Sequence, residues 1–167
     1  MKISKNWITE FISIPKSTNL ENELTQLGLE VDSIKKYKDD HIIDIEFTPN
    51  RGDCLSVYGT ARDLGAHKGK KISKPLVSSY TLSKENNHFD KISKDICPEY
   101  GYMMLNGVDV KQKTPKYIKD KLIKSDITPV NIIVDVSNYV MIELGQPTHA
   151  FDKDVINGKL SIKLNNK

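Results

Sequence analysis

The sequence predicts an α+β fold in which a small N-terminal domain of three helices and a β-hairpin is followed by an incomplete α+β unit. Two stretches, 29–36 and 41–47, alternate apolar and polar residues, which is typical of paired strands. Apolar residues recur at helical spacing on both sides of this hairpin and again after residue 113. A chain of 167 residues is long enough for one domain or two small ones.

The first two helices are predicted between residues 4 and 28. Ser4 precedes a first helix that Pro15 closes. Thr18 and Glu21 form a capping box at the start of the second helix, and Gly28 suits the left-handed position after its last turn. We expect the buried stripes of the two helices to consist of Trp7, Ile8, Phe11, Ile12, Leu20, Leu24 and Leu27.

The third helix is predicted from Cys54 to about His67. Thr48 and Pro49 end the second strand, residues 50–52 turn the chain, and Asp53 is placed to cap the helix. Its apolar face consists of Leu55, Tyr58, Ala61 and Leu64. We expect the first domain to have one core, which contains Trp7, Leu24, Leu27, Val31, Ile45, Leu55 and Leu64.

The second unit is predicted to combine short strands with two helices. Strands are expected at 76–82 and 100–110, one helix begins at Thr114 and Pro115, and a second helix covers 131–144 up to Gly145. The core face of the 131–144 helix is predicted to be Ile133, Val136, Val140 and Leu144. The period-two stretch 160–164 predicts a last strand with no partner after it, so we expect the sheet to be incomplete.

Composition excludes several classes of protein. A mean hydropathy of −0.46 and the lack of long apolar runs exclude a transmembrane span, so we expect no membrane partner. The two cysteines are interpreted as reduced thiols, which favours a cytoplasmic location. Cys54 and Cys97 form no CxxC motif, which argues against a zinc site or a disulfide framework. The net charge is only +3, and just two of the 25 basic residues are arginines, so charge alone does not indicate a nucleic-acid partner.

Six strings along the chain resemble bacterial phenylalanyl-tRNA synthetase beta subunits. In the family's order they are the N-terminal pattern with Trp7, GLEVDSI at 28–34, TPNRGDCLS at 48–56, GTARDLGA at 59–66, CPEY at 97–100 and DVSNYVMIELGQPTHAFD at 135–152. The resemblance covers residues 1–163. It implies a B1-like domain at 1–70, a linker with the first strand at 71–90, and the N-terminal part of an editing-type (B3/B4-like) domain at 91–167.

The chain also departs from this family. The family carries an OB-type domain between the GLEVD and TPNR strings, whereas 13 residues join them here. The resemblance therefore implies a fragment or truncated form of the subunit, which takes part in tRNA aminoacylation inside a larger alpha–beta assembly and is not active alone. Its expected partners are the alpha subunit, the remaining beta-subunit polypeptide and, weakly, tRNA. No cofactor is expected in this chain, because ATP and magnesium bind in the full assembly.

Three residues match the editing pocket of the family. Ser137 and Asn138 match its Thr-Asn pair, and His149 matches its histidine. In that family a second site hydrolyses tyrosyl esters, because an apolar pocket discriminates poorly against an added hydroxyl. A histidine can orient or deprotonate water, and an amide and a hydroxyl can hold the substrate. The alternative is that Ser137 and Asn138 are only the polar side of a helix and that His149 is a turn residue.

Several cations of the family's RNA-facing surface are replaced. Glu99, Met103 and Thr128 stand where the family commonly has arginine, which predicts weak, electrostatic tRNA binding that is lost near physiological salt. The lysine pairs 35–36 and 70–71 would form an RNA-binding stripe only if they cluster with other cations in space. The alternative function is therefore a stand-alone, non-catalytic RNA- or protein-binding module derived from the subunit.

Overall fold

The computed structural model describes residues 1–79, 88–90 and 93–164. It has a mixed α/β structure with two compact units, which are described separately. The first unit combines Met1–Leu76 with Val110–His149, and the second combines Val77–Asp109 with Ala150–Lys167. Residues 110–149 therefore pack with the N-terminal part of the chain, so the division into units does not follow the domain boundaries expected from the sequence, 1–70 and 91–167.

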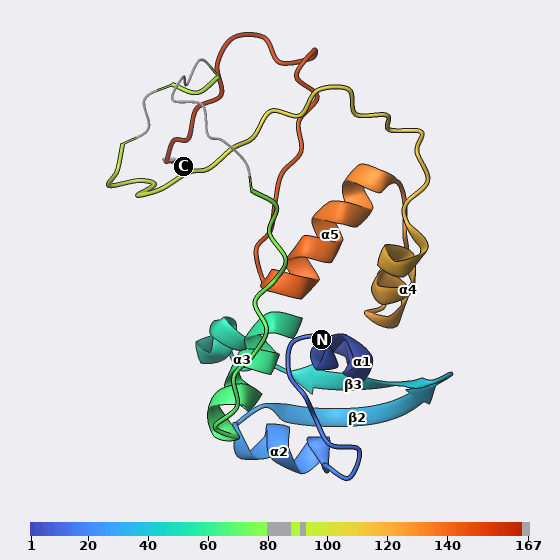
Figure 1. Cartoon of the computed structure of the whole chain (residues 1–167). Helices are drawn as coiled ribbons and strands as arrows, with labels where there is room; N and C mark the ends of the chain where they lie inside the picture. Colours follow the sequence, from blue (N-terminus) through green and yellow to red (C-terminus); the bar gives the residue numbers. More distant parts are fainter. Residues whose placement is uncertain (80–87, 91–92, 165–167) are drawn as a thin grey trace. The chain divides into compact units, whose positions relative to one another are not determined.

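The first unit is built on a three-stranded antiparallel sheet with strand order β1-β3-β2 (Figure 1). The strands are β1 (Lys2–Ser4), β2 (Glu30–Tyr37) and β3 (Asp40–Glu46). β2 and β3 pair as a hairpin where the alternation predicts one, and Lys38 has a positive φ of 55° in its turn. The sequence does not predict β1, because three residues are too few to show a period of two.

Three α-helices and one 3-10 helix accompany the sheet. They are α1 (Lys5–Thr9), α2 (Leu20–Gln26), α3 (Val57–His67) and the 3-10 helix Pro49–Cys54. Two predicted caps are wrong. Asn19, and not Thr18, caps α2 by accepting from the Asn22 amide at 3.2 Å. Ser56, and not Asp53, caps α3, because the 3-10 helix uses the residues before it.

The core of the first unit lies between the sheet and these helices. Trp7, Leu24, Ile45 and Leu64 are buried there, as expected. Leu27 and Val31 are only partly buried, and Leu55 is 48% exposed, so its predicted place in the core is wrong. α3 starts two residues beyond Leu55. The fully buried members of the core are Ile3, Ile8, Leu24, Leu29, Ile43, Ile45, Cys54, Val57, Ala61 and Leu64.

Two further helices, α4 (Lys116–Lys124) and α5 (Ile132–Leu144), complete the first unit. The Asn131 side chain caps α5 by accepting from two backbone amides at 3.1 Å, and Gly145 ends it in the left-handed conformation, as the sequence predicts. Ile142 on α5 belongs to the same buried core as Trp7.

The predicted core face of α5 is wrong. Val136 and Leu144 are exposed, and Ile133 and Val140 are only partly buried. The helix instead buries Asp135 and Ile142. The Asp135 carboxylate accepts a hydrogen bond from the Thr114 hydroxyl at 2.5 Å and from the Val130 amide at 2.8 Å, so a charged residue occupies an inward position that apolar periodicity does not reveal.

The second unit has little regular structure within the described residues. The strands expected at 100–110 and 160–164 are absent, and Phe89 and Leu160 form only an isolated parallel bridge. Residues 76–79 of the strand expected at 76–82 are not in a strand, and the remainder lies outside the described residues. Phe89 packs its ring against Tyr100 and Tyr102, with ring centroids 4.8 Å apart in both pairs. Across the described part of the chain, no helix is long and apolar enough to cross a membrane.

Candidate functional site

The three predicted site residues lie on α5 and on the loop that follows it. Ser137 and Asn138 are in the middle of the helix and partly buried, and His149 lies on the exposed loop. Gly145 reverses the chain with φ +75°, and a Cβ there would meet the Ser56 side chain at 3.3 Å. This turn returns the loop along the helix.

One contact links the two parts of this site. The Ser137 hydroxyl donates to the Thr148 carbonyl at 3.1 Å and lies 2.8 Å from the Thr148 hydroxyl. The structure therefore brings Ser137 together with the residue that precedes His149. Because its hydroxyl is engaged with the loop, Ser137 is placed to hold the loop against the helix.

The helix that carries Ser137 and Asn138 is anchored to the N-terminal core by an aromatic cluster. The Trp7 and Tyr139 rings stack with centroids 5.1 Å apart. Glu143 accepts from the Trp7 indole at 3.2 Å and from the Tyr139 hydroxyl at 2.7 Å. Lys121 lies 4.7 Å from the centroid of the Trp7 ring and pairs with Glu10 at 2.7 Å.

Sequence reasoning missed Tyr139 and Glu143 as the residues that position this helix. Their i, i+4 spacing beside Ser137 and Asn138 was the available signal, since residues four apart share a helix face. Burial, followed by the hydrogen bond to Glu143, raises the pKa of Tyr139 well above its ordinary value. The phenol therefore remains a neutral donor to the Glu143 carboxylate.

A second polar cluster surrounds Arg51. Its guanidinium donates to the Leu27 carbonyl and the Asp63 carboxylate, both at 2.7 Å, and to Asp53 at 3.2 Å. Arg62 also pairs with Asp53, at 3.0 Å. Both arginines thus pair with carboxylates, and the cluster ties the end of α2 to the 3-10 helix and to α3.

The ligand atoms of Asp53, Cys54 and Asp63 lie within 4.8 Å of one another, which is close enough to hold a metal ion. The Arg51 guanidinium already lies among them, 2.7 Å from both the Cys54 sulfur and Asp63. A positive group therefore fills the place that a cation would take, and we interpret the cluster as structural.

Cys54 is expected to be an unreactive thiol. Its side chain is fully buried, and burial, followed by the hydrogen bond to Asp53, raises the pKa of the thiol to about 12. At pH 8 we expect a disulfide reagent such as DTNB to titrate one thiol in the folded protein, Cys97, which is partly exposed. The Cys97→Ser variant should show no rapid reaction until it is unfolded, and rapid labelling of Cys54 in that folded variant would contradict the structure.

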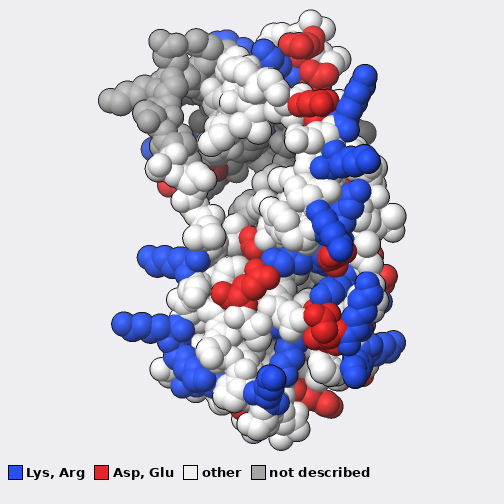
Figure 2. All heavy atoms as spheres, turned by 45° about the vertical axis from the view of Figure 1, so that its right-hand side comes forward, with Lys and Arg blue, Asp and Glu red and all other residues white. Residues whose placement is uncertain are grey.

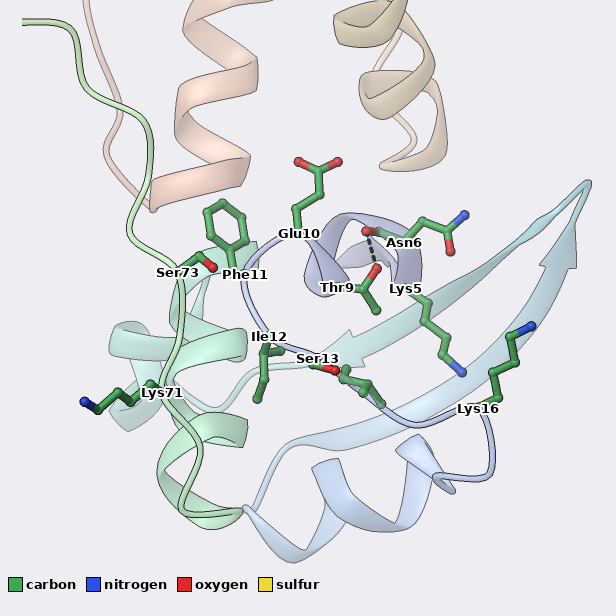
Figure 3. Close-up of a pocket in the computed structure, with 11 residues that line it drawn as sticks. Lys5, Asn6, Thr9, Glu10, Phe11, Ile12, Ser13, Lys16, Lys71 and Ser73 are labelled. Carbon is green, nitrogen blue, oxygen red and sulfur yellow. Dashed lines mark hydrogen bonds between the residues drawn. The ribbon is translucent and has the colours of Figure 1, made fainter.

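A group of lysines surrounds a hollow beside α1, which has a volume of about 600 Å³. Figure 3 shows Lys5 and Lys16 extending to one side of it and Lys71 to the opposite side. Two contacts bring the segment 70–73 alongside residues 11–13: the Ser73 amide donates to the Phe11 carbonyl at 2.8 Å, and the Lys70 ammonium donates to the Ser13 carbonyl at 3.1 Å. We call this group of Lys5, Lys16 and Lys71 the lysine hollow.

Comparison with known proteins identifies the relatives of this chain. A sequence profile of the B3/4 domain matches residues 96–167. The phenylalanine–tRNA ligase beta subunit of Idiomarina loihiensis is 41% identical over 127 residues, which are 75% of this chain and 16% of that subunit. This chain is similar to part of the phenylalanine–tRNA ligase beta subunit. The beta subunits of Pseudomonas syringae pv. syringae and Dechloromonas aromatica are 39% identical over 127 and 135 residues, which are 75% and 79% of this chain but only 16% and 17% of those subunits.

The B3/4 match covers some of the candidate features of this chain and leaves others outside it. Residues 96–167 include Ser137, Asn138 and His149. The lysine hollow and the Arg51 cluster lie before residue 96 and outside that match. The predicted editing residues and the lysine hollow can therefore be tested separately.

Proposed function

We propose that this chain works as part of a phenylalanine–tRNA ligase beta subunit, in an assembly that attaches phenylalanine to tRNA. The supporting observation is the 36–41% identity over at least 75% of the chain to beta subunits of several bacteria. Its partners in this proposal are the alpha subunit, further beta-subunit polypeptide and tRNA. ATP and magnesium act in the assembly and outside this chain.

Within this assembly we propose that α5 and the following loop supply part of an editing pocket. Water attacks the carbonyl carbon of a tyrosyl ester, the bond to the tRNA ribose oxygen breaks, and tyrosine and tRNA are released. His149 orients the attacking water or accepts its proton, and the Asn138 amide donates to the substrate. Ser137 holds the loop through its contacts with Thr148.

A hybrid subunit tests the assembly. The matched segment of this chain replaces its counterpart in the Idiomarina loihiensis beta subunit, and the hybrid is produced together with the alpha subunit of that organism. We expect the alpha subunit to purify with the hybrid in the same ratio as with the parent beta subunit. A hybrid that folds but retains no alpha subunit would contradict the proposal and favour the stand-alone binding module.

The editing residues are tested in the same hybrid. We expect His149→Ala and Asn138→Ala to slow hydrolysis of tyrosyl-tRNA by about 100-fold or more, which is the size of effect that acid–base groups and oxyanion donors contribute. Attachment of phenylalanine should not change. The control is Gln146→Ala, an exposed residue on the same loop. Equal losses in all three variants, or none, would contradict the assignment.

A further inference from the structure

Some lysine and arginine side chains of the first unit are already paired with carboxylates, and others are not. Arg51, Lys68, Lys121 and Lys124 pair with carboxylates at 2.5–2.7 Å. None of the ion pairs found among the described residues involves a member of the lysine hollow. These three lysines therefore keep their charges available for an outside anion.

The carboxylate that lines the lysine hollow does not cancel this charge. Glu10 pairs with Lys121 at 2.7 Å, on the side of α4. Figure 3 shows the Glu10 side chain directed away from Lys5 and Lys16. On the face that Figure 2 shows, acidic and basic side chains are interspersed. The lysine hollow is thus a concave region where positive charge is not balanced from within.

These lysines are far apart in the sequence, and the fold brings them together. Lys5 starts α1, Lys16 lies in the loop before α2, and Lys71 follows α3. The two backbone-directed hydrogen bonds between residues 11–13 and 70–73 fix this juxtaposition. Lys71 of the lysine pair 70–71 therefore lines the same hollow as Lys5 and Lys16.

We propose that the lysine hollow binds successive phosphates of an RNA backbone. Its cations come from both sides of an open hollow, so they can contact more than one phosphate of an extended chain, and lysine contacts a phosphate as a point charge. This inference rests on the proposed function, because it identifies tRNA as the RNA. Binding is electrostatic and carries no base specificity.

The test measures filter binding of tRNA to the full chain across a salt series. The variant Lys5→Gln/Lys16→Gln/Lys71→Gln is compared with Lys35→Gln/Lys36→Gln/Lys38→Gln, which removes three exposed lysines from the hairpin and changes the net charge equally. We expect the first variant to lower the slope of log affinity against log salt by about 2–3. At low salt it should bind roughly tenfold more weakly for each phosphate that it no longer neutralises. The hairpin variant should be weakened clearly less.

Three results would overturn the inference. They are equal losses of affinity in the two triple variants, no binding by the unmodified chain at low salt, and displacement of tRNA by inorganic phosphate beyond the effect of ionic strength. The last result would indicate a site for a single phosphate. None of these three results would contradict the proposed function. That function is tested by retention of the alpha subunit in the hybrid, which does not depend on RNA. Thermal melting by circular dichroism establishes that both variants are folded.

Discussion

Replacing Trp7 by alanine is expected to lower the free energy of unfolding by about 3–5 kcal/mol. The Trp7 side chain is 1% exposed, stacks on Tyr139 and donates to Glu143. Its removal leaves a cavity and takes away the packing that holds α5 against the core. Urea denaturation measures the effect, with the Cm and the m value fitted separately.

Leu76→Ala provides the control for Trp7. Leu76 is fully exposed, so its replacement should change the free energy of unfolding by less than about 0.5 kcal/mol. A Trp7→Ala variant that is destabilised by less than about 1 kcal/mol would show that α5 does not pack on the N-terminal core as described.

Asp40→Ala is expected to destabilise the protein by about 3–5 kcal/mol, because it leaves a largely buried cation without its partner. The Asp40 side chain is fully buried and pairs with Lys124 at 2.7 Å. It also accepts from the Ser4 hydroxyl at 2.5 Å and from the backbone amides of Asn6 and His41 at 3.0 and 2.8 Å. Asp39→Ala, at the neighbouring and exposed turn residue, should cost less than about 0.5 kcal/mol.

Asp40 also makes the free energy of unfolding depend on pH. Burial pushes the pKa of Asp40 upward, but hydrogen bonds from Lys124, Ser4 and the two amides outweigh it and hold the pKa below its ordinary value. A lowered carboxyl pKa contributes stability that is fully present above the unfolded-state pKa, about 3.9, and is lost as the pH falls through the folded-state pKa. The stability difference between wild type and Asp40→Asn should be constant from pH 5 to 7 and shrink below about pH 4. A difference that grows in acid would contradict the assignment.

Local patterns predicted the hairpin and the helices, but they wrongly predicted strands at 100–110 and 160–164 and did not reveal the long-range packing. The hairpin, the helix from Asn131 and its left-handed Gly145 follow from alternation, capping and glycine chemistry, which act over a few residues. Local patterns do not predict the packing of α4 and α5 with residues 1–76. The Trp7–Tyr139 stack and the Lys124–Asp40 pair join residues that are 132 and 84 positions apart. The buried Asp135 shows the same limit, since its partners are fixed only once the chain has folded.

For the candidate site, the sequence proposes residues but does not show how they are arranged. The strings around Ser137 and His149 indicated an editing pocket, and the structure adds the link from Ser137 to Thr148. The lysine hollow could not be located from sequence, because its members come from three separate segments. Hydrogen bonds between residues 11–13 and 70–73, formed once the chain has folded, hold two of those segments together.

The rate of phenylalanine attachment by the hybrid ligase tests the central claim most directly. The matched segment of this chain is 41% identical to the Idiomarina loihiensis segment that it replaces. We expect the hybrid, with its alpha subunit, to charge tRNA with phenylalanine at a rate within about tenfold of the parent enzyme, since a tenfold decrease is only about 1.4 kcal/mol of transition-state stabilisation. A hybrid that folds and binds the alpha subunit but charges tRNA no faster than the alpha subunit alone would contradict the account.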